Sequence, residues 1–583
     1  MKPSLGGGRA LVALALIALA AFALWERLRG IGMMLPYATE SVDEHIAFRQ
    51  LQIFRGAEFD PREDPFYGLY PHVLSRTAWL LPTDGGGEER PGMGLEEHLK
   101  RARAPWLELR AASALLSLGI VPGTYWLARA FLGAGWSLLA AAFAATSLLH
   151  AAYTQLVRPH GAVTTFVLLT VVAAIHLRRH PALHRYLLAG LAAGLAIGSL
   201  HSGIFALGPL LVAHVLRARA ARGRSRWWIL GSLGLVAASV WVFYPFHFQA
   251  PAHFLGLEET ARGTAFNLSG QPLFLEEFNG AGFRVIAWTL ATYDPLLLVL
   301  ASAGLAIVLV GLVRRPPGQG TRLDLAVALA HAVPYTVVIG LYAGTWERFL
   351  LQLLPYAGIL AAAAVRALAS SLAPSPSPRA AGLSIALGVL LLALPAAGVH
   401  RLGTVRGAAD TQQLAADWIR SHLDPGKDRV LAVPILDLPL LQSAEALRRN
   451  APMGASPWVE YQAGLSAELG GAERFDLLLP GEIAVAQAEI QADARAWLAA
   501  SRANYVLVAS GPADAAGPAM HRLRYALAGE ADRVARFSTE RIDRGEDTTF
   551  PYGYYGMAWT PPLLLRVFEA ERMGRTLEMY RLR

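Results

Sequence analysis

The chain has 583 residues, of which 54% are hydrophobic and 16% charged, with a formal net charge of +8 and no cysteine. A soluble domain is about one quarter charged, so this composition excludes an ordinary soluble protein. The absence of cysteine excludes disulfides, thiolate metal sites and cysteine nucleophiles. The basic residues lie mainly in short loops between apolar segments, so membrane topology explains them better than a nucleic-acid partner does.

Apolar residues gather in runs that approach the length of a bilayer-crossing helix. We predict an all-α membrane domain with about eleven transmembrane helices, since each needs about 20 mainly apolar residues. Short runs rich in glycine and alanine can merge or be missed, which leaves the exact number open. The predicted spans are residues 11–24, 111–127, 135–149, 162–177, 186–200, 204–216, 227–243, 285–313, 323–341, 349–368 and 383–399.

Arginine marks alternate loops between these spans. Arginine-rich loops stay in the cytoplasm, so their alternation with loops that carry almost no lysine or arginine predicts a cytoplasmic N-terminus in a multi-pass protein of the plasma (inner) membrane. Three larger segments are then exterior, at residues 29–104, about 247–284, and after about 400. A cleaved signal peptide is the alternative for the first span. The basic loops are 178–185, 217–226, 314–322 and 375–379, and the others are 150–160, 199–203 and 342–348.

The sequence after residue 400 has the pattern of a small extracytoplasmic α/β domain, which we assign to residues 401–583. Residues 410–422 have helical spacing, with Leu414, Trp418 and Ile419 on one face. A turn at Asp424 precedes a predicted strand at 429–436, and a second strand is predicted at 504–509. Helices alternating with short apolar strands predict this fold class. No glycine-rich phosphate loop precedes a helix there, which disfavours a nucleotide-sugar donor.

An acidic pair, Asp43 and Glu44, opens an amphipathic segment just after the first span. The apolar residues from 42 to 54 recur at near-helical spacing, as in a helix at a membrane surface. Ser41 followed by Glu44 also fits a capping box, so a structural role is the alternative to a catalytic one. Neighbouring helical positions point about 100° apart, so the two carboxylates serve different roles.

This acidic pair and four later motifs resemble the GT-C glycosyltransferases, in the branch of protein O-mannosyltransferases and aminoarabinose transferases. The motifs follow the order of that branch across the predicted membrane domain, residues 1–400. They are Tyr70-Pro71-His72 before the second span, Arg110-Ala-Ala-Ser113 in it, Tyr153 to Arg158-Pro159-His160 before the fourth span, and Trp346-Glu347-Arg348 to Pro355 at a late span.

The resemblance implies transfer of a hexose or pentose from a polyprenyl-phosphate sugar, with inversion, to a protein, lipid or glycan acceptor outside the cytoplasm. Asp43 would be the general base for the acceptor hydroxyl, and Glu44 is the second catalytic candidate. Arg348, Arg158 and His160 are the candidates for binding the donor phosphate.

Two of these residues, Arg348 and His160, have alternative interpretations. Arg348 could extend to the lipid headgroups or pair with Glu347. The related enzymes usually have aspartate where this chain has His160, so a divalent metal cofactor stays open and no metal ligand is assigned. A histidine at a helix start is also common at a membrane interface. Asp294, which precedes Pro295 at a span entrance, is predicted to be a helix N-cap.

Two other functional classes compete with the glycosyltransferase. A transporter or lipid-carrier flippase also uses charges within the membrane and spans interrupted by glycine and proline. The span pattern shows no internal repeat, which disfavours this alternative. A non-catalytic GT-C relative is the third hypothesis, and His160 keeps it open.

Overall fold

The structure is a computed structural model, and Asp43 lies outside the residues that it describes. The chain divides into two compact units. The membrane unit comprises Met1–Leu28, Asp43–Leu80 and Leu109–His400, and the sheet unit comprises Arg29–Val42, Leu81–Glu108 and Arg401–Arg583. The described residues are 5–37, 44, 93–217, 222–244, 264–268, 271–314, 317–373, 378–434, 437–450, 456–465, 473–480, 483–509, 513–543, 545, 549–550 and 563–583.

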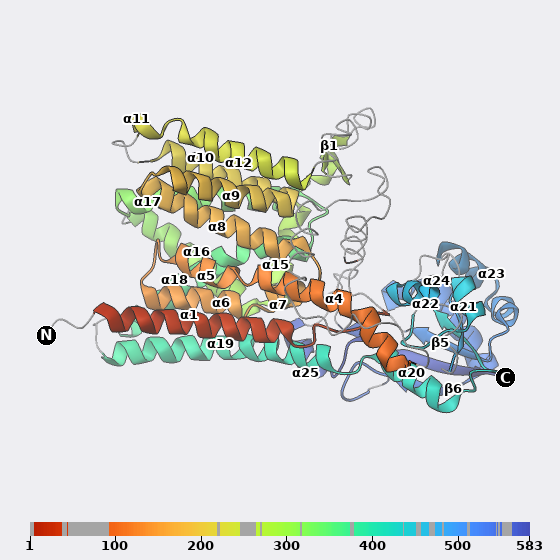
Figure 1. Cartoon of the computed structure of the whole chain (residues 1–583). Helices are drawn as coiled ribbons and strands as arrows, with labels where there is room; N and C mark the ends of the chain where they lie inside the picture. The colour runs from red at the N-terminus through yellow and green to blue at the C-terminus, as the bar shows by residue number, and fades with distance from the viewer. Residues whose placement is uncertain are drawn as a thin grey trace. The chain divides into compact units, whose positions relative to one another are not determined.

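Within the described residues, the membrane unit is built from helices and a single β-hairpin, β1 (Thr264–Leu268) with β2 (Gln271–Phe274). Helices α8, α9 and α12 pack side by side, and α18 packs on α16 and α6 (Figure 1). The helices that lie wholly or partly in this unit are α1 (Leu5–Leu28), α4 (Leu95–Ser117), α5 (Ile120–Ala128), α6 (Ala134–Ala145), α7 (Leu148–Thr154), α8 (Pro159–Arg179), α9 (Leu183–Ser199), η1 (His201–Ala206), α10 (Leu207–Val215), α11 (Arg222–Ser225), α12 (Trp228–Phe243), η4 (Leu275–Glu277), α15 (Ala281–Tyr293), α16 (Pro295–Arg314), α17 (Gln319–Leu341), η5 (Glu347–Leu353), α18 (Leu354–Leu372) and α19 (Pro378–Gly407).

The prediction of a multi-pass helical membrane domain is confirmed, but the number of eleven spans is not. In the described part of the chain, seven helices are long and apolar enough to cross a membrane, or eight if the bent pair α6 and α7 forms one span. Helix α12 is apolar but shorter. The predicted span at 285–313 is interrupted after Asp294, because Pro295 has no backbone N–H to continue the preceding helix.

The break between α6 and α7, where the chain bends by 51°, is capped on both sides. The Arg27 guanidinium donates to the Ala145 carbonyl at the end of α6. The Asp294 carboxylate accepts hydrogen bonds from the Leu148 and Leu149 amides and from the Ser147 hydroxyl at the start of α7. The prediction that Asp294 caps the helix that follows it is therefore wrong: Ser147 is the N-cap residue of α7, and the Asp294 side chain binds the start of α7 from a distant part of the chain.

Replacing Asp294 with alanine is expected to lower the free energy of unfolding by about 2–4 kcal/mol, because three buried donors lose a charged acceptor. The measurement is thermal unfolding of the purified protein in detergent. Asp417→Ala is the matched control, since Asp417 is 47% exposed in an ion pair with Arg420. That control should change the free energy by less than about 0.5 kcal/mol. Equal effects of the two substitutions would contradict the capping role.

The sheet unit contains a mixed five-stranded sheet in the order β4-β3-β5-β9-β6. β3 is parallel to β4 and β5, whereas β9 is antiparallel to β5 and β6. The α/β class predicted for this region is confirmed. The remaining elements are α20 (Thr411–His422), β3 (Arg429–Val433), α21 (Ala444–Asn450), α22 (Pro457–Gly464), β4 (Asp476–Leu478), α23 (Ile483–Ser501), β5 (Tyr505–Ala509), α24 (Ala513–Glu530), β6 (Ala531–Phe537), β7 (Thr549–Phe550), α25 (Leu563–Glu569), β8 (Gly574–Arg575) and β9 (Leu577–Leu582).

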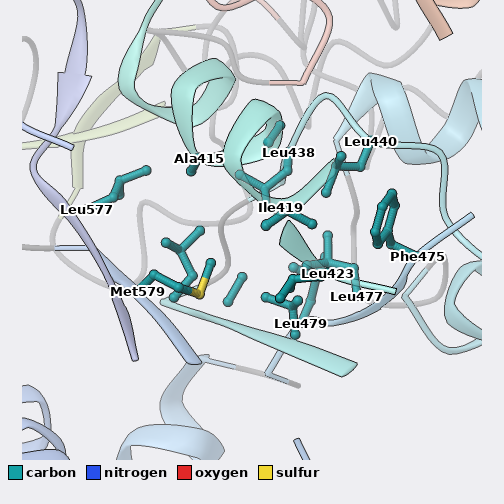
Figure 2. Packing of buried hydrophobic residues seen from close by; sticks show 14 of the residues in the cluster. Ala415, Ile419, Leu423, Leu438, Leu440, Phe475, Leu477, Leu479, Leu577 and Met579 are labelled. Atoms are coloured by element: carbon teal, nitrogen blue, oxygen red, sulfur yellow. The ribbon is translucent and has the colours of Figure 1, made fainter. Parts of the chain in front are cut away.

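Alternation along the strands gives the sheet two buried faces. In β3, Val430 and Ala432 face one core, which also includes Ile419 of α20 (Figure 2). Leu431 and Val433 face the other core, which includes residues of α23 and α24. A near-continuous apolar run is expected for a strand that is covered by helices on both sides.

A buried carboxylate in the sheet unit predicts a pH-dependent stability. Asp437 accepts hydrogen bonds from the Ser456 hydroxyl, the Leu438 amide and the Gln442 side chain. Burial nevertheless raises the pKa of Asp437 to about 7. Between its ordinary pKa of 3.8 and that value, the folded state holds a proton that the unfolded state has released. The stability contributed by this group therefore decreases as the pH rises from about 4 to 7.

Asp437→Asn is expected to remove this pH dependence, because asparagine has no charge to bury. The stability of the variant relative to the wild type should increase by about 3 kcal/mol between pH 5 and pH 8, because the wild-type carboxyl group loses its proton in this range. Thermal unfolding of the full chain at the two pH values measures the difference. A stability change of the same size at both pH values would contradict the assigned titration.

Candidate functional site

Arg158 and His160 lie at the N-terminus of α8. Arg158 is the N-cap and has extended backbone angles, and Pro159 at the first helical position fixes the start of the helix. The Nδ1 atom of His160 is buried and has no hydrogen-bond partner among the described residues. The free backbone amides of a helix N-terminus carry partial positive charge, so this end of α8 favours an anion.

Arg348 reaches the same place from η5. Its guanidinium packs against the rings of Trp346 and Phe349, at 5.3 and 5.5 Å from their centroids. The Phe349 ring also stacks on His160, with centroids 5.6 Å apart and an angle of 15° between the planes. Both guanidinium groups, of Arg158 and Arg348, are near enough to His160 to interact with it electrostatically. The three predicted phosphate-binding residues therefore come together.

The loop that carries Arg158 is held in place by Glu44 and by both polar residues of the Arg110–Ser113 motif. The Glu44 carboxylate accepts two hydrogen bonds from Arg110, at 3.0 and 2.9 Å, and one from the Val157 amide at 2.8 Å. The Ser113 hydroxyl donates to the Leu156 carbonyl at 2.8 Å. Since Glu44 and Arg110 are fully buried, Glu44 is a structural anchor in this geometry.

Helix α8 also approaches α4 closely beside the site. A Cβ atom added at Gly161 would lie 1.9 Å from the Ser117 hydroxyl oxygen, so only glycine fits in this first turn of α8. The close contact brings Arg158 and His160 against the helix that supplies Arg110 and Ser113.

Glu347 forms a second polar cluster, which the sequence pattern did not predict. Its Oε2 atom accepts hydrogen bonds from the Tyr153 and Tyr293 hydroxyls, the latter at 2.8 Å. The sequence suggested a pair between Glu347 and Arg348, and the two do interact electrostatically, but the hydrogen bonds go to the tyrosines. The position of Glu347 directly before Arg348 was the one sequence signal for this cluster.

Helix α17 and η1 position the η5 segment. The Tyr335 hydroxyl of α17 donates to the Phe349 carbonyl at 2.8 Å. His331, also in α17, lies 3.2 Å from the Gln352 side-chain oxygen, and Gln352 donates to the Ser202 hydroxyl. These contacts hold η5 on the C-terminal side of Arg348, which limits the positions that its guanidinium can reach.

Two parts of the predicted site lie outside the described residues, namely Asp43 and the Tyr70–His72 motif. Among the residues that the structure does describe, no group of three histidine, aspartate or glutamate side chains could hold a metal ion. Two guanidinium groups beside His160 also repel a cation and suit an anion.

The family of dolichyl-phosphate-mannose-protein mannosyltransferases matches residues 69–254, a segment that includes α8 and its N-terminal loop. Over these residues, the match confirms the predicted resemblance to the protein O-mannosyltransferase branch. No match was found among curated proteins.

Several solved structures show a distant likeness. The protein O-mannosyltransferase complex of S. cerevisiae bound to the sugar donor is 21% identical and has a TM-score of 0.32. This chain spans 35% of the length of that yeast chain, and 42% of this chain is covered. ArnT from Cupriavidus metallidurans bound to undecaprenyl phosphate is 15% identical, with 90% of this chain and 96% of that chain covered and a TM-score of 0.44. The oligosaccharyltransferase AglB from Archaeoglobus fulgidus is 12% identical, with 90% and 73% covered and a TM-score of 0.45.

Proposed function

We propose that this chain transfers a monosaccharide from a polyprenyl-phosphate sugar to an acceptor outside the cytoplasm, with inversion at the anomeric carbon. The observation that carries the proposal is the meeting of Arg158, His160 and Arg348 at the N-terminus of α8. The matched family, whose description includes dolichyl-phosphate mannose, supports a lipid-linked donor. The proposal places catalysis in residues 1–400 and leaves residues 401–583 as an accessory domain.

The cluster suits the leaving group of this reaction. A polyprenyl phosphate gains charge on its oxygen as the bond to the sugar breaks, and cationic donors in a low-dielectric site stabilise that charge. Arg158 and Arg348 supply charge-assisted hydrogen bonds, and the α8 N-terminus adds its dipole. The buried Nδ1 atom of His160 is a further hydrogen-bonding group for a phosphate oxygen.

The other half of the reaction requires a base. Asp43 takes the proton from the acceptor hydroxyl as that oxygen attacks the anomeric carbon, which is general base catalysis in a single displacement. Glu44 is held by Arg110 and Val157, so we assign the base to Asp43 alone. In the orientation proposed from the loop charges, the N-terminus is cytoplasmic and both the site and the sheet unit face the exterior.

Binding of sugar-free carriers tests the phosphate cluster. Arg158→Gln and Arg348→Gln are each expected to weaken binding of undecaprenyl or dolichyl phosphate by about 10- to 100-fold, the loss of one charge-assisted hydrogen bond. Arg314→Gln, at the exposed C-terminus of α16, is the matched control and should leave the affinity unchanged. Affinities unchanged in all three variants would contradict a phosphate site at α8.

A further inference from the structure

The two oxygen atoms of the Glu347 carboxylate differ in their hydrogen bonds. Both tyrosine hydroxyls donate to Oε2, and their rings lie 6.2 Å apart at an angle of 47°. The Oε1 atom accepts no hydrogen bond from any described residue. Anchoring η5 to α7 and α15 would explain the two hydrogen bonds to Oε2, but it gives no role to Oε1. Glu347 is only partly buried, so a hydrogen-bond donor from outside the chain can reach Oε1.

This carboxylate stands next to the proposed phosphate cluster. Glu347 directly precedes Arg348 and interacts electrostatically with it. Tyr153, one of its two partners, interacts electrostatically with Arg158. In a polyprenyl-phosphate sugar, a single oxygen atom joins the phosphorus to the anomeric carbon. A phosphate held by Arg158 and Arg348 therefore brings the sugar ring among the residues that border these two arginines.

The chemistry of Glu347 matches a hydroxyl group. An ionised carboxylate only accepts hydrogen bonds, and a sugar ring presents several O–H donors. A hydrogen bond to a charged acceptor is about twice as strong as one between neutral groups. The hydroxyl on the carbon next to the anomeric carbon is the one nearest to the phosphate, so it is the first that a neighbour of Arg348 can reach.

We propose that Oε1 of Glu347 accepts a hydrogen bond from the hydroxyl group next to the anomeric carbon of the donor sugar. Tyr153 and Tyr293 hold the carboxylate through Oε2, so that Oε1 is directed at the sugar. The inference rests on the proposed function and deepens it, since it assigns the donor to sugars that carry this hydroxyl. Glu347 is then a residue for donor specificity, distinct from the residues that bind the phosphate.

Binding of three ligands to wild type and Glu347→Gln tests the assignment. The ligands are undecaprenyl phosphate, the undecaprenyl-phosphate hexose or pentose that the wild type binds most tightly, and the 2-deoxy form of that donor. Glu347→Gln is expected to weaken binding of the sugar-bearing donor by about 10- to 100-fold and that of undecaprenyl phosphate by less than about twofold. Wild type should bind the 2-deoxy donor more weakly than the normal donor by a similar factor. Glu347→Gln should bind the two donors with equal affinity.

Tyr293→Phe provides a second variant that keeps the carboxylate. It should weaken binding of the sugar-bearing donor by a smaller factor and leave binding of undecaprenyl phosphate unchanged. Equal weakening of the sugar-bearing and sugar-free ligands in both variants would overturn this inference, because Glu347 would then act only through Arg348. The inference would also be overturned if the 2-deoxy donor lost as much affinity with Glu347→Gln as with the wild type, because the two changes would then act independently. Failure of the wild type to bind undecaprenyl phosphate would instead contradict the proposed function itself.

Discussion

Asp43→Asn is expected to reduce the turnover number for sugar transfer by about 10²- to 10⁴-fold, the range that a general base contributes. Asparagine has the same shape but does not take up the proton of the acceptor hydroxyl. Binding of the donor should persist, because the proposed phosphate ligands Arg158 and Arg348 are unchanged. The measurement is the turnover number, with the affinity for the donor determined in parallel.

Loss of donor binding in Asp43→Asn would contradict the role of a base, since that result would place Asp43 in the donor site. Full activity of the variant would assign the proton transfer to another group. Because wild-type Asp43 is ionised when it acts, the rate should also fall at low pH, as the carboxyl group becomes protonated.

Glu44→Gln is expected to lose stability and not only turnover, because the substitution destabilises the membrane unit. The substitution removes the Glu44 charge from the buried Arg110 guanidinium, and breaking a buried ion pair costs about 3–5 kcal/mol. The double variant with Arg110→Met should recover part of this loss, because neither remaining side chain is charged and glutamine still accepts from the Val157 amide.

Thermal unfolding in detergent, together with the monodisperse fraction on size exclusion, measures this effect. Glu276→Gln is the matched control, since Glu276 is exposed in η4, and it should behave as wild type. A double variant less stable than Glu44→Gln would contradict the ion-pair account. Loss of turnover without loss of stability in Asp43→Asn, together with loss of stability in Glu44→Gln, would show that the first carboxylate is catalytic and the second structural.

The spans and the sheet unit could be anticipated because they depend on local patterns. Apolar runs predicted the membrane helices. In the sheet unit, helical spacing predicted α20, and two short apolar runs predicted β3 and β5. The number of spans was less predictable, since Pro295 divides one apolar run. Strand β9 was not predicted, because it is defined by antiparallel pairing with β5, far away in the sequence.

The candidate site was predictable only in part, for the same reason. The order of the motifs identified Arg158, His160 and Arg348 without showing that His160 stacks on Phe349. The tyrosine partners of Glu347 are 194 and 54 residues away along the chain, so no local pattern could reveal them. The capping box of Ser41 and Glu44 stays a prediction, because Ser41 lies outside the described residues. No local pattern indicated that the Glu44 carboxylate binds Arg110 and the Val157 amide.

The most direct test of the central claim is sugar transfer by the purified full chain in liposomes. The donors would be radiolabelled polyprenyl-phosphate mannose and polyprenyl phosphates that carry other hexoses or pentoses. A membrane extract would be the source of acceptors. We expect label to pass from one of these donors to an acceptor, with release of an equal amount of polyprenyl phosphate. A folded wild-type protein that transfers no label from any donor, yet moves a polyprenyl-phosphate sugar between the leaflets, would contradict the glycosyltransferase and indicate a flippase.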